Sequence, residues 1–282
     1  MSEKIEPSTN LETLDITKYP ITTNAFTWTP MMIFIYLMLH ALTLLFPTFM
    51  ILTFYSNVMG ENFFHYRVFT IFIDVLAWWG VYILFALVLG KIFLILLELI
   101  HKSKEGLFKI DKKDKDYYYF CMRVTVKKFI FWIWNNFCFP WASNLAFKIC
   151  KMKVDFKSTL FDGWSDVEFI EFGKNTMLGQ GAVILSSMIV GDHLLIKKVI
   201  IGDHVVIGGN AIVAPGTIIG KGTTLGVWAT THIGQVLESN YIYVGRPARK
   251  FQSITDMRNE SKKRVRRIVD TGERVEFTWS RK

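Results

Sequence analysis

An aliphatic residue returns at every sixth position in the stretch IIGDHVVIGGNAIVAPGTIIGKGTTLG, which covers residues 200–226. Small residues, most of them glycine, follow the aliphatic ones, and small or β-branched residues fill the fifth position of each hexad. An α-helix repeats every ~3.6 residues and a strand about every second residue, so neither has this spacing. The aliphatic positions are Ile201, Ile207, Val213, Ile219 and Leu225.

A left-handed parallel β-helix accounts for a six-residue repeat. Each hexad forms a short strand and a corner, three hexads close one triangular coil, and the aliphatic side chains point to the axis. Equivalent residues of successive coils then stack roughly 4.8 Å apart. Since one coil has no core of its own, several must stack, and about four fit into residues 154–251.

The repeat changes phase upstream of this stretch. An earlier set comprises Phe172, Leu178, Ile184 and Val190, but the distance from Ile184 to Ile201 is seventeen residues, one short of a full coil. Residues 185–198 are therefore predicted to leave the regular wall as a loop or an irregular coil. Segments of this kind, held by a rigid scaffold, often carry functional residues.

The N-terminal half contains two apolar segments, residues 31–54 and 68–90, each long enough to span a bilayer. His40 is the only ionisable residue of the first segment, and Asp74 is the only charged residue of the second. Ionisable groups inside a membrane are functional candidates, either as a direct pair or separately. The alternative is a structural polar contact between the two helices, or a histidine that simply faces a neighbouring side chain.

Basic residues predict the orientation of these spans. The link 56–67 carries a single basic residue, Arg67, whereas lysines are frequent after the second span. The positive-inside rule then places both chain ends, and with them the repeat domain, in the cytosol. Residues 117–151 are rich in aromatic residues and interrupted by basic ones, which indicates a helix that lies in the membrane interface.

Charge and composition narrow the function classes. The net charge is +9, and the basic residues concentrate in residues 102–128 and 246–282. Because the first patch directly follows an apolar span, it favours an anionic membrane surface over nucleic acid. Three scattered cysteines predict neither a disulfide framework nor a zinc site, and no metal is expected. A phosphate-binding loop, a dinucleotide fingerprint and a Gly-x-Ser-x-Gly elbow are all absent from the sequence.

The predicted organisation has five parts. They are a cytosolic N-terminal segment (1–29), two transmembrane helices (30–101), basic and aromatic interfacial linker helices (102–153), a left-handed β-helix domain (154–251) and a basic C-terminal tail (252–282).

The repeats are followed by YVGRPARKF, in which residues 245–249 resemble the closing Gly-x-Pro-Ala-Lys/Arg signature of the hexapeptide-repeat acyltransferase superfamily. A narrower resemblance covers the order of membrane spans, PWASNLAFKICKMKV, LFDGWSDVEFIEFGKNTMLGQGAVI and the repeats. In this respect the chain looks most similar to the membrane-bound C-terminal hexapeptide modules of non-ribosomal peptide synthetase-like proteins, of the poly-lysine synthetase type.

The resemblance implies an acyltransferase that forms a homotrimer or works with a partner synthetase. Its donor would be acyl-CoA or a carrier-protein thioester, and its acceptor a small-molecule amine or hydroxyl. A histidine in an irregular loop would act as general base, because a neutral imidazole accepts a proton near pH 7. The synthetase-like modules often carry Thr-His or Ser-His at the start of that loop, where this chain has Ser186, Ser187 and Met188.

Two histidines are candidates for the base. His193 lies inside the irregular segment, with Asp192 beside it as a potential orienting carboxylate, and His232 opens the C-terminal cap. Either could instead be a solvated corner residue, which is the better interpretation of His204. Ser187 is a candidate nucleophile without an evident base. Adjacent residues of an extended chain point apart, which counts against Asp192 as the orienting group.

Arg246 and Arg249 are candidate ligands of the CoA phosphates, because guanidinium groups pair well with phosphate. The alternative for both is a salt bridge within the cap.

Two functions follow for the whole chain. One is a membrane-anchored acyltransferase at the inner membrane face, and the other is a non-catalytic β-helix scaffold for a partner synthetase or transporter.

Overall fold

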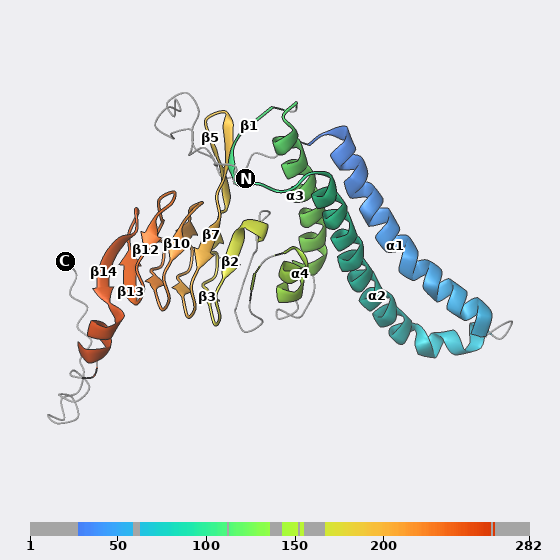
Figure 1. The fold of residues 1–282 in the computed structure, drawn as a ribbon. Coiled ribbons are helices and arrows are strands. Elements are labelled where there is room, and N and C mark those ends of the chain that lie inside the picture. Colours follow the sequence, from blue (N-terminus) through green and yellow to red (C-terminus); the bar gives the residue numbers. More distant parts are fainter. Residues whose placement is uncertain are drawn as a thin grey trace.

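The computed structural model describes residues 28–58, 63–111, 113–135, 143–151, 153–154, 167–260 and 262. The predicted N-terminal segment up to residue 27, most of the basic C-terminal tail and the centre of the 56–67 link lie outside these residues. Figure 1 shows a helical part beside a stack of short strands, with the stack extending away from α3. The helices are α1 (Pro30–Val58), α2 (Phe63–Ile100), α3 (Lys115–Asn135) and α4 (Ser143–Ile149), with the 3₁₀ turn η4 (Val167–Phe169).

Helices α1 and α2 form an antiparallel pair whose outer surface is apolar. Both are long and apolar enough to cross a membrane. Large side chains such as Phe49, Phe72 and Leu76 are 69%, 79% and 71% exposed. Water would penalise so much exposed apolar surface, whereas lipid would not. The two predicted spans are thus helices, and their insertion into a membrane stays a prediction.

His40 and Asp74 do not meet. The Tyr55 hydroxyl donates a hydrogen bond to Asp74, which joins α1 to α2. The His40 ring instead lies 4.9 Å from the Phe129 ring and 5.1 Å from the Trp132 ring, both on α3. Each polar group therefore makes its own contact between helices, which matches the structural alternative for both.

Helix α3 is buried against its neighbours along most of its length. Arg123 and Lys127, one helical turn apart, are 4% and 1% exposed. Arg123 Nε lies 3.6 Å from Glu168 Oε1 in η4, and Lys127 Nζ contacts the other carboxylate oxygen. These two charges thus pair inside the protein rather than forming a stripe that faces headgroups. The interfacial position of α3 itself stays a prediction.

The strands are short, and most have two to four residues. They are β1 (Gly106–Lys109), β2 (Ile170–Phe172), β3 (Met177–Leu178), β4 (Val183–Ile184), β5 (Ser187–Val190), β6 (His193–Ile196), β7 (Val199–Ile201), β8 (Val206–Ile207), β9 (Ile212–Val213), β10 (Ile218–Ile219), β11 (Thr224–Leu225), β12 (Val236–Leu237), β13 (Tyr241–Val244) and β14 (Arg249–Ser253).

The strands stack as a parallel β-helix. Ile201 pairs with Ile219, and Ile219 with Leu237, each one coil of three hexads further along the chain. One wall has the strand order β12-β10-β7-β2, which gives the four layers that the repeat predicts. Strand β14 folds back antiparallel on β13 and ends the stack. The β-helix is therefore confirmed, and its left hand stays a prediction.

The hexad pattern has a steric cause in the stack. The axial Ile207 and Leu225 are at most 1% exposed, and the fifth-position residues Val205 and Ala211 are fully buried. A Cβ atom at Gly208 would lie 2.5 Å from the Val227 backbone nitrogen of the next coil. Glycine behind the axial residue is thus what allows the coils to approach at this corner.

The phase break is a β-hairpin, not an irregular coil. Phe172 pairs with Ile201 across 29 positions, while Ile201 and Ile219 are 18 positions apart. The 11 additional residues leave the wall as β5 and β6, which pair antiparallel with each other. The prediction that this segment leaves the wall is confirmed, but it forms a hairpin and not a loop or irregular coil, and Val190 belongs to β5 and not to the axial set.

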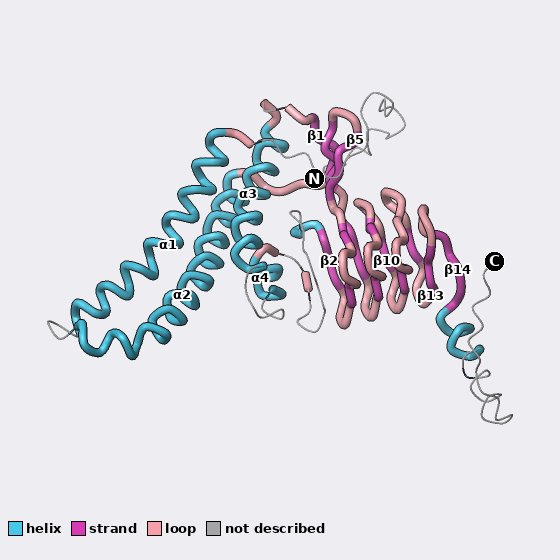
Figure 2. Tube along the Cα trace, turned by 180° about the vertical axis from the view of Figure 1, so that it is seen from behind, coloured by secondary structure: helices cyan, strands magenta, loops and turns pink. Residues whose placement is uncertain are grey.

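The hairpin binds the linker that follows α2. Strand β1 pairs antiparallel with β6, which completes a three-stranded sheet in the order β1-β6-β5. Figure 2 shows this sheet projecting from the β-helix toward the ends of the helices. The Lys198 N–H also donates a hydrogen bond of 2.9 Å to Glu105 Oε2 in the linker. The hairpin thus connects the β-helix to the linker that follows the helices.

Candidate functional site

A cavity of about 490 Å³ lies between the base of the hairpin and the wall of the β-helix. Leu185 and Met188 contribute from the hairpin side, and Ile212 contributes from β9. His232 and Ile233 contribute from the turn that precedes β12. The lining is predominantly apolar, and His232 is its only titratable residue among those that the structure describes.

The backbone of His232 is held by a local network. Its N–H donates to Gln235 Oε1 at 2.9 Å, and Gln235 Nε2 donates to the carbonyl oxygen of Ala248 at 2.8 Å. The preceding Thr231 is buried, and its hydroxyl accepts from the Ala214 N–H at 2.8 Å. These bonds fix where the turn places the imidazole, while the side chain itself stays exposed at the cavity.

The hairpin face beside this cavity is a small apolar cluster. Met188, Val190 and Leu195 are buried together, and Leu107 of β1 and Ile233 pack against them. The cavity wall therefore depends on three segments that are distant in sequence. The hexad repeat stacks the His232 turn on β9, where Ile212 and Thr230 are one coil apart, whereas the hairpin side is brought to them by strand pairing outside the repeat.

His193 lies away from the cavity lining. It is the first residue of β6, opposite Lys109 and Val190 in the register. Its Nδ1 atom lies 2.6 Å from Asp192 Oδ1. The expectation that these neighbours point apart was wrong, because Asp192 occupies the tight turn after Gly191, whose φ is +63°, and not an extended strand.

Ser187 is buried in β5, where it is 8% exposed and pairs with Ile196 in the register. It is not part of the cavity lining, although its neighbour Met188 is. Successive residues of a strand point to opposite faces, and this alternation separates the two side chains. The structure therefore brings His232 to the cavity, and leaves Ser187 on the opposite face of the hairpin and His193 at its tip.

The two arginines lie at the C-terminal end of the stack. Arg246 Nε donates a hydrogen bond of 2.7 Å to the carbonyl oxygen of Trp228, and its guanidinium lies 5.0 Å from the indole centroid. Arg249 is exposed at the start of β14. Within the described part of the chain neither forms a salt bridge, so the cap salt bridge that the sequence leaves open is not seen.

The remaining histidine of the β-helix occupies an ordinary corner. His204 is exposed, has a φ of +57° and donates its backbone N–H to Lys174, as a repeat corner would. The described residues contain no group of three or more His, Cys, Asp or Glu side chains that could hold a metal ion.

The sequence held a signal for the hairpin that the hexad pattern obscured. Gly191 and Asp192 are flanked on both sides by apolar and β-branched residues, which is a pattern typical of a two-residue hairpin turn. Strand β1 has no comparable signal, because its four residues lie within a lysine-rich segment. The hairpin side of the cavity therefore could not be predicted from the hexads, whereas the side formed by β9 and the His232 turn belongs to the repeat.

Residues 198–227 match the family model described as the hexapeptide repeat of succinyl-transferase. The six-residue repeat of this stretch is therefore a hexapeptide repeat of the kind that the model describes. No curated protein matches the chain. The match covers the most regular part of the β-helix and includes neither the hairpin nor the helices, and the narrower likeness to synthetase-like modules stays a proposal.

Several solved structures are similar in part. An N-acyltransferase from Bacillus cereus, in complex with dTDP and 3-hydroxybutyryl-CoA, is 25% identical over 34% of this chain and 60% of its own, with a TM-score of 0.28. A maltose O-acetyltransferase from Clostridium difficile 630 is 22% identical over 32% and 61%, with a TM-score of 0.29. A hexapeptide-repeat acetyltransferase from Vibrio cholerae, complexed with acetyl coenzyme A, is 16% identical over 56% and 97%, with a TM-score of 0.41.

This chain thus spans less than two thirds of the length of the first two of these proteins. The function has to be inferred from its own residues.

Proposed function

We propose that this chain is a membrane-anchored acyltransferase. It would move an acyl or aminoacyl group from acyl-CoA or a carrier-protein thioester to an amine or hydroxyl at the inner membrane face. The observation that carries the proposal is His232, an exposed imidazole on a hydrogen-bonded turn, at the edge of an apolar cavity of about 490 Å³. An apolar cavity beside a single basic group suits a hydrocarbon acyl chain and a proton transfer.

In the proposed reaction, neutral His232 accepts the proton of the acceptor amine or hydroxyl as that group attacks the thioester carbonyl. A new C–N or C–O bond forms, the C–S bond breaks, and the leaving thiolate takes the proton from the imidazolium. Ile233 lines the cavity, and its backbone N–H makes no hydrogen bond within the described residues. It is therefore a candidate donor to the oxyanion.

The donor would lie along the C-terminal end of the stack. Arg246 and Arg249 offer guanidinium groups that are not neutralised by a described carboxylate, and Trp228 presents an indole that is 57% exposed. These groups would bind phosphates and a flat base. The exposed apolar helices support the anchor, and the lysines after α2 support a cytosolic repeat domain. A homotrimer would complete the arrangement.

The experiment is acyl transfer by the detergent-purified full-length chain. Labelled acyl-CoAs of increasing chain length are supplied with an amine and lipid extract, and initial rates are compared for wild type, His232→Ala and His193→Ala. Loss of a general base lowers the rate by roughly 10²–10⁴-fold, and this loss is expected for His232→Ala. His204→Ala, at an exposed corner of the same wall, is the matched control and should stay near the wild-type rate.

The possible results distinguish between the two candidate bases and between the two proposed functions. Loss of turnover in His193→Ala with a normal rate in His232→Ala would assign the base to the hairpin tip. Absence of both turnover and donor binding in the wild type would refute the enzyme. It would favour the scaffold for a partner synthetase or transporter, which Ser186–Ser187–Met188 in place of a loop histidine already supports.

A further inference from the structure

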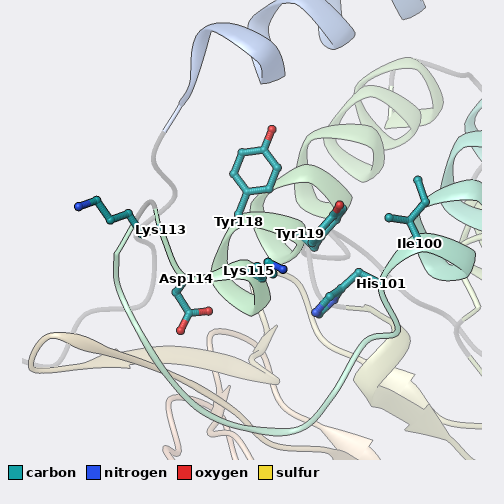
Figure 3. A pocket seen from close by; sticks show the side chains of 7 residues that line it. All are labelled: Ile100, His101, Lys113, Asp114, Lys115, Tyr118 and Tyr119. Carbon is teal, nitrogen blue, oxygen red and sulfur yellow. The ribbon is translucent and has the colours of Figure 1, made fainter.

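A second cavity, of about 420 Å³, lies outside the acyl-transfer site, where α2 ends and α3 begins. Figure 3 shows the side chains that line it, from the last residue of α2 to the second turn of α3. Its polar lining comprises His101, Lys113, Asp114, Lys115, Tyr118 and Tyr119. The proposed acyl transfer uses none of these groups.

Two lysines supply the positive charge of this cavity. Lys113 and Lys115 are exposed, and neither forms an ion pair within the part of the chain that the structure describes. Lys102 and Lys104 are exposed on the segment that leaves α2 and add to the positive potential. The phenols of Tyr118 and Tyr119 provide hydroxyl donors beside the ammonium groups.

The nearby carboxylates are already engaged in local structure. Asp114 accepts the Tyr117 N–H at 3.0 Å as the cap of α3, and Figure 3 shows its carboxylate turned away from Tyr118 and Tyr119. Asp116 Oδ1 lies 3.0 Å from His101 Nε2. The His101 ring also stacks on Tyr119, with centroids 4.7 Å apart and planes 3° from parallel. The carboxylates thus hold the cavity in shape and leave its two lysines for a ligand.

The position of the cavity indicates where such a ligand comes from. Ile100 lines it, is 66% exposed and is the last residue of the apolar helix that is long enough to cross a membrane. Leu99 beside it is 78% exposed. A ligand in this cavity would therefore have a cationic wall on one side and the apolar end of α2 on the other.

We propose that this cavity binds a phosphate group. The ammonium group of Lys115 would contact its oxygens, and Lys113, which Figure 3 shows pointing away from the other lining side chains, would turn inward to do the same. The tyrosine hydroxyls would donate hydrogen bonds to the phosphate. The phosphate belongs either to the headgroup of an anionic phospholipid, whose chains would follow Ile100 along α2, or to a free phosphate. The lipid source rests on the proposed membrane insertion of α2, whereas neither source depends on acyl transfer.

The test is equilibrium binding to the whole chain in detergent, with native mass spectrometry as the measurement. Two probes are compared, dioctanoyl phosphatidylglycerol and inorganic phosphate alone. The double variant Lys113→Ala/Lys115→Ala should bind the effective probe at least about tenfold more weakly. Lys113→Arg/Lys115→Arg should retain most of the affinity. The matched control is Lys174→Ala/Lys221→Ala, which removes the same charge from exposed lysines of the β-helix.

Binding of phosphatidylglycerol but not of inorganic phosphate identifies a lipid headgroup site, and binding of both to the same variants identifies a free-phosphate site. The proposal is overturned if wild type binds neither probe, or if the cavity variant and the control lose affinity equally. Acyl transfer is measured on the same preparations. Retained turnover with lost phosphate binding separates this site from that of His232, and absent turnover with intact binding refutes only the acyltransferase.

Discussion

Glu168 places a carboxylate between two buried cations of α3 at the entrance to the β-helix. Arg123 Nε lies 3.6 Å from one of its oxygens, and Lys127 contacts the other. Glu168→Gln would leave buried positive charge without this compensation, which typically costs about 3–5 kcal/mol. We expect a loss of that size in the free energy of unfolding, measured by denaturant titration in detergent.

The control for this change is Glu238→Gln. Glu238 pairs with Lys250 at 2.7 Å, but its side chain is 62% exposed. A surface pair contributes roughly 0–1 kcal/mol. Equal losses in the two variants would show that burial does not set the strength of the Glu168 contacts.

The contribution of Glu171 to the stability of the fold should depend on pH. Hydrogen bonds from Lys153, at 2.5 Å, and then from Lys198, at 2.7 Å, lower the pKa of this carboxyl below its ordinary value. A lowered folded-state pKa contributes stability above the unfolded-state value of about 4.3, and this contribution is lost as the pH falls through the folded-state pKa.

The unfolding temperatures of wild type and Glu171→Gln should therefore differ by a constant amount above about pH 5 and converge below it. The measurement is thermal unfolding from pH 3 to pH 7. A difference that does not change with pH would contradict the assignment of the contribution to the ionised carboxylate.

At the scale of elements, the hairpin of β5 and β6 is held by one strand of the linker. Leu107 of β1 packs on Met188, Val190 and Leu195. Leu107→Asp would place a carboxylate in this apolar cluster and should detach β1 from the hairpin, because an unpaired buried charge is strongly unfavourable. Limited proteolysis should then cleave within residues 185–198 at a higher rate, while the β-helix resists cleavage.

Lys109→Asp is the matched control, since Lys109 lies on the same strand and is exposed. It should leave the cleavage rate near that of the wild type. Rapid cleavage of the whole β-helix in Leu107→Asp would indicate that the stability of the stack depends on the hairpin.

The elements differ in how far their sequences predict them. The hexads predict β7 to β11 well, because every axial position must be apolar and the residue directly after it must be small. The hairpin and β1 are weaker cases. Val190 fits the hexad phase by coincidence, and β1 is a strand only because β6 supplies its hydrogen-bond partners.

At the scale of the whole molecule, the helical part and the β-helix share one continuous set of buried residues that extends from Met32 to Ala248. Membrane insertion is a property of the whole chain.

We expect the full chain to stay in the membrane fraction after alkaline extraction, because the outer faces of α1 and α2 are apolar.

A cysteine introduced at residue 60 should react with an impermeant reagent from the outside of intact cells, and one at residue 221 should not. Reaction at residue 221 alone would reverse the predicted orientation. Release of the chain by alkaline extraction would show that α1 and α2 do not cross the membrane.

The sequence by itself determined the β-helix, the two apolar helices and the exposed corner at His204, because each follows from a period or a composition that a single segment carries. Only the tertiary structure decided which candidate meets the cavity. The residue types of His193, Ser187 and His232 do not reveal which of them lines a cavity, and the positions of the first two depend on 11 residues that leave the wall as the hairpin. The repeat stacks the His232 turn on β9, but the hairpin side of the cavity depends on strand pairing outside the hexad pattern, whose register is set by the turn at Gly191 and Asp192.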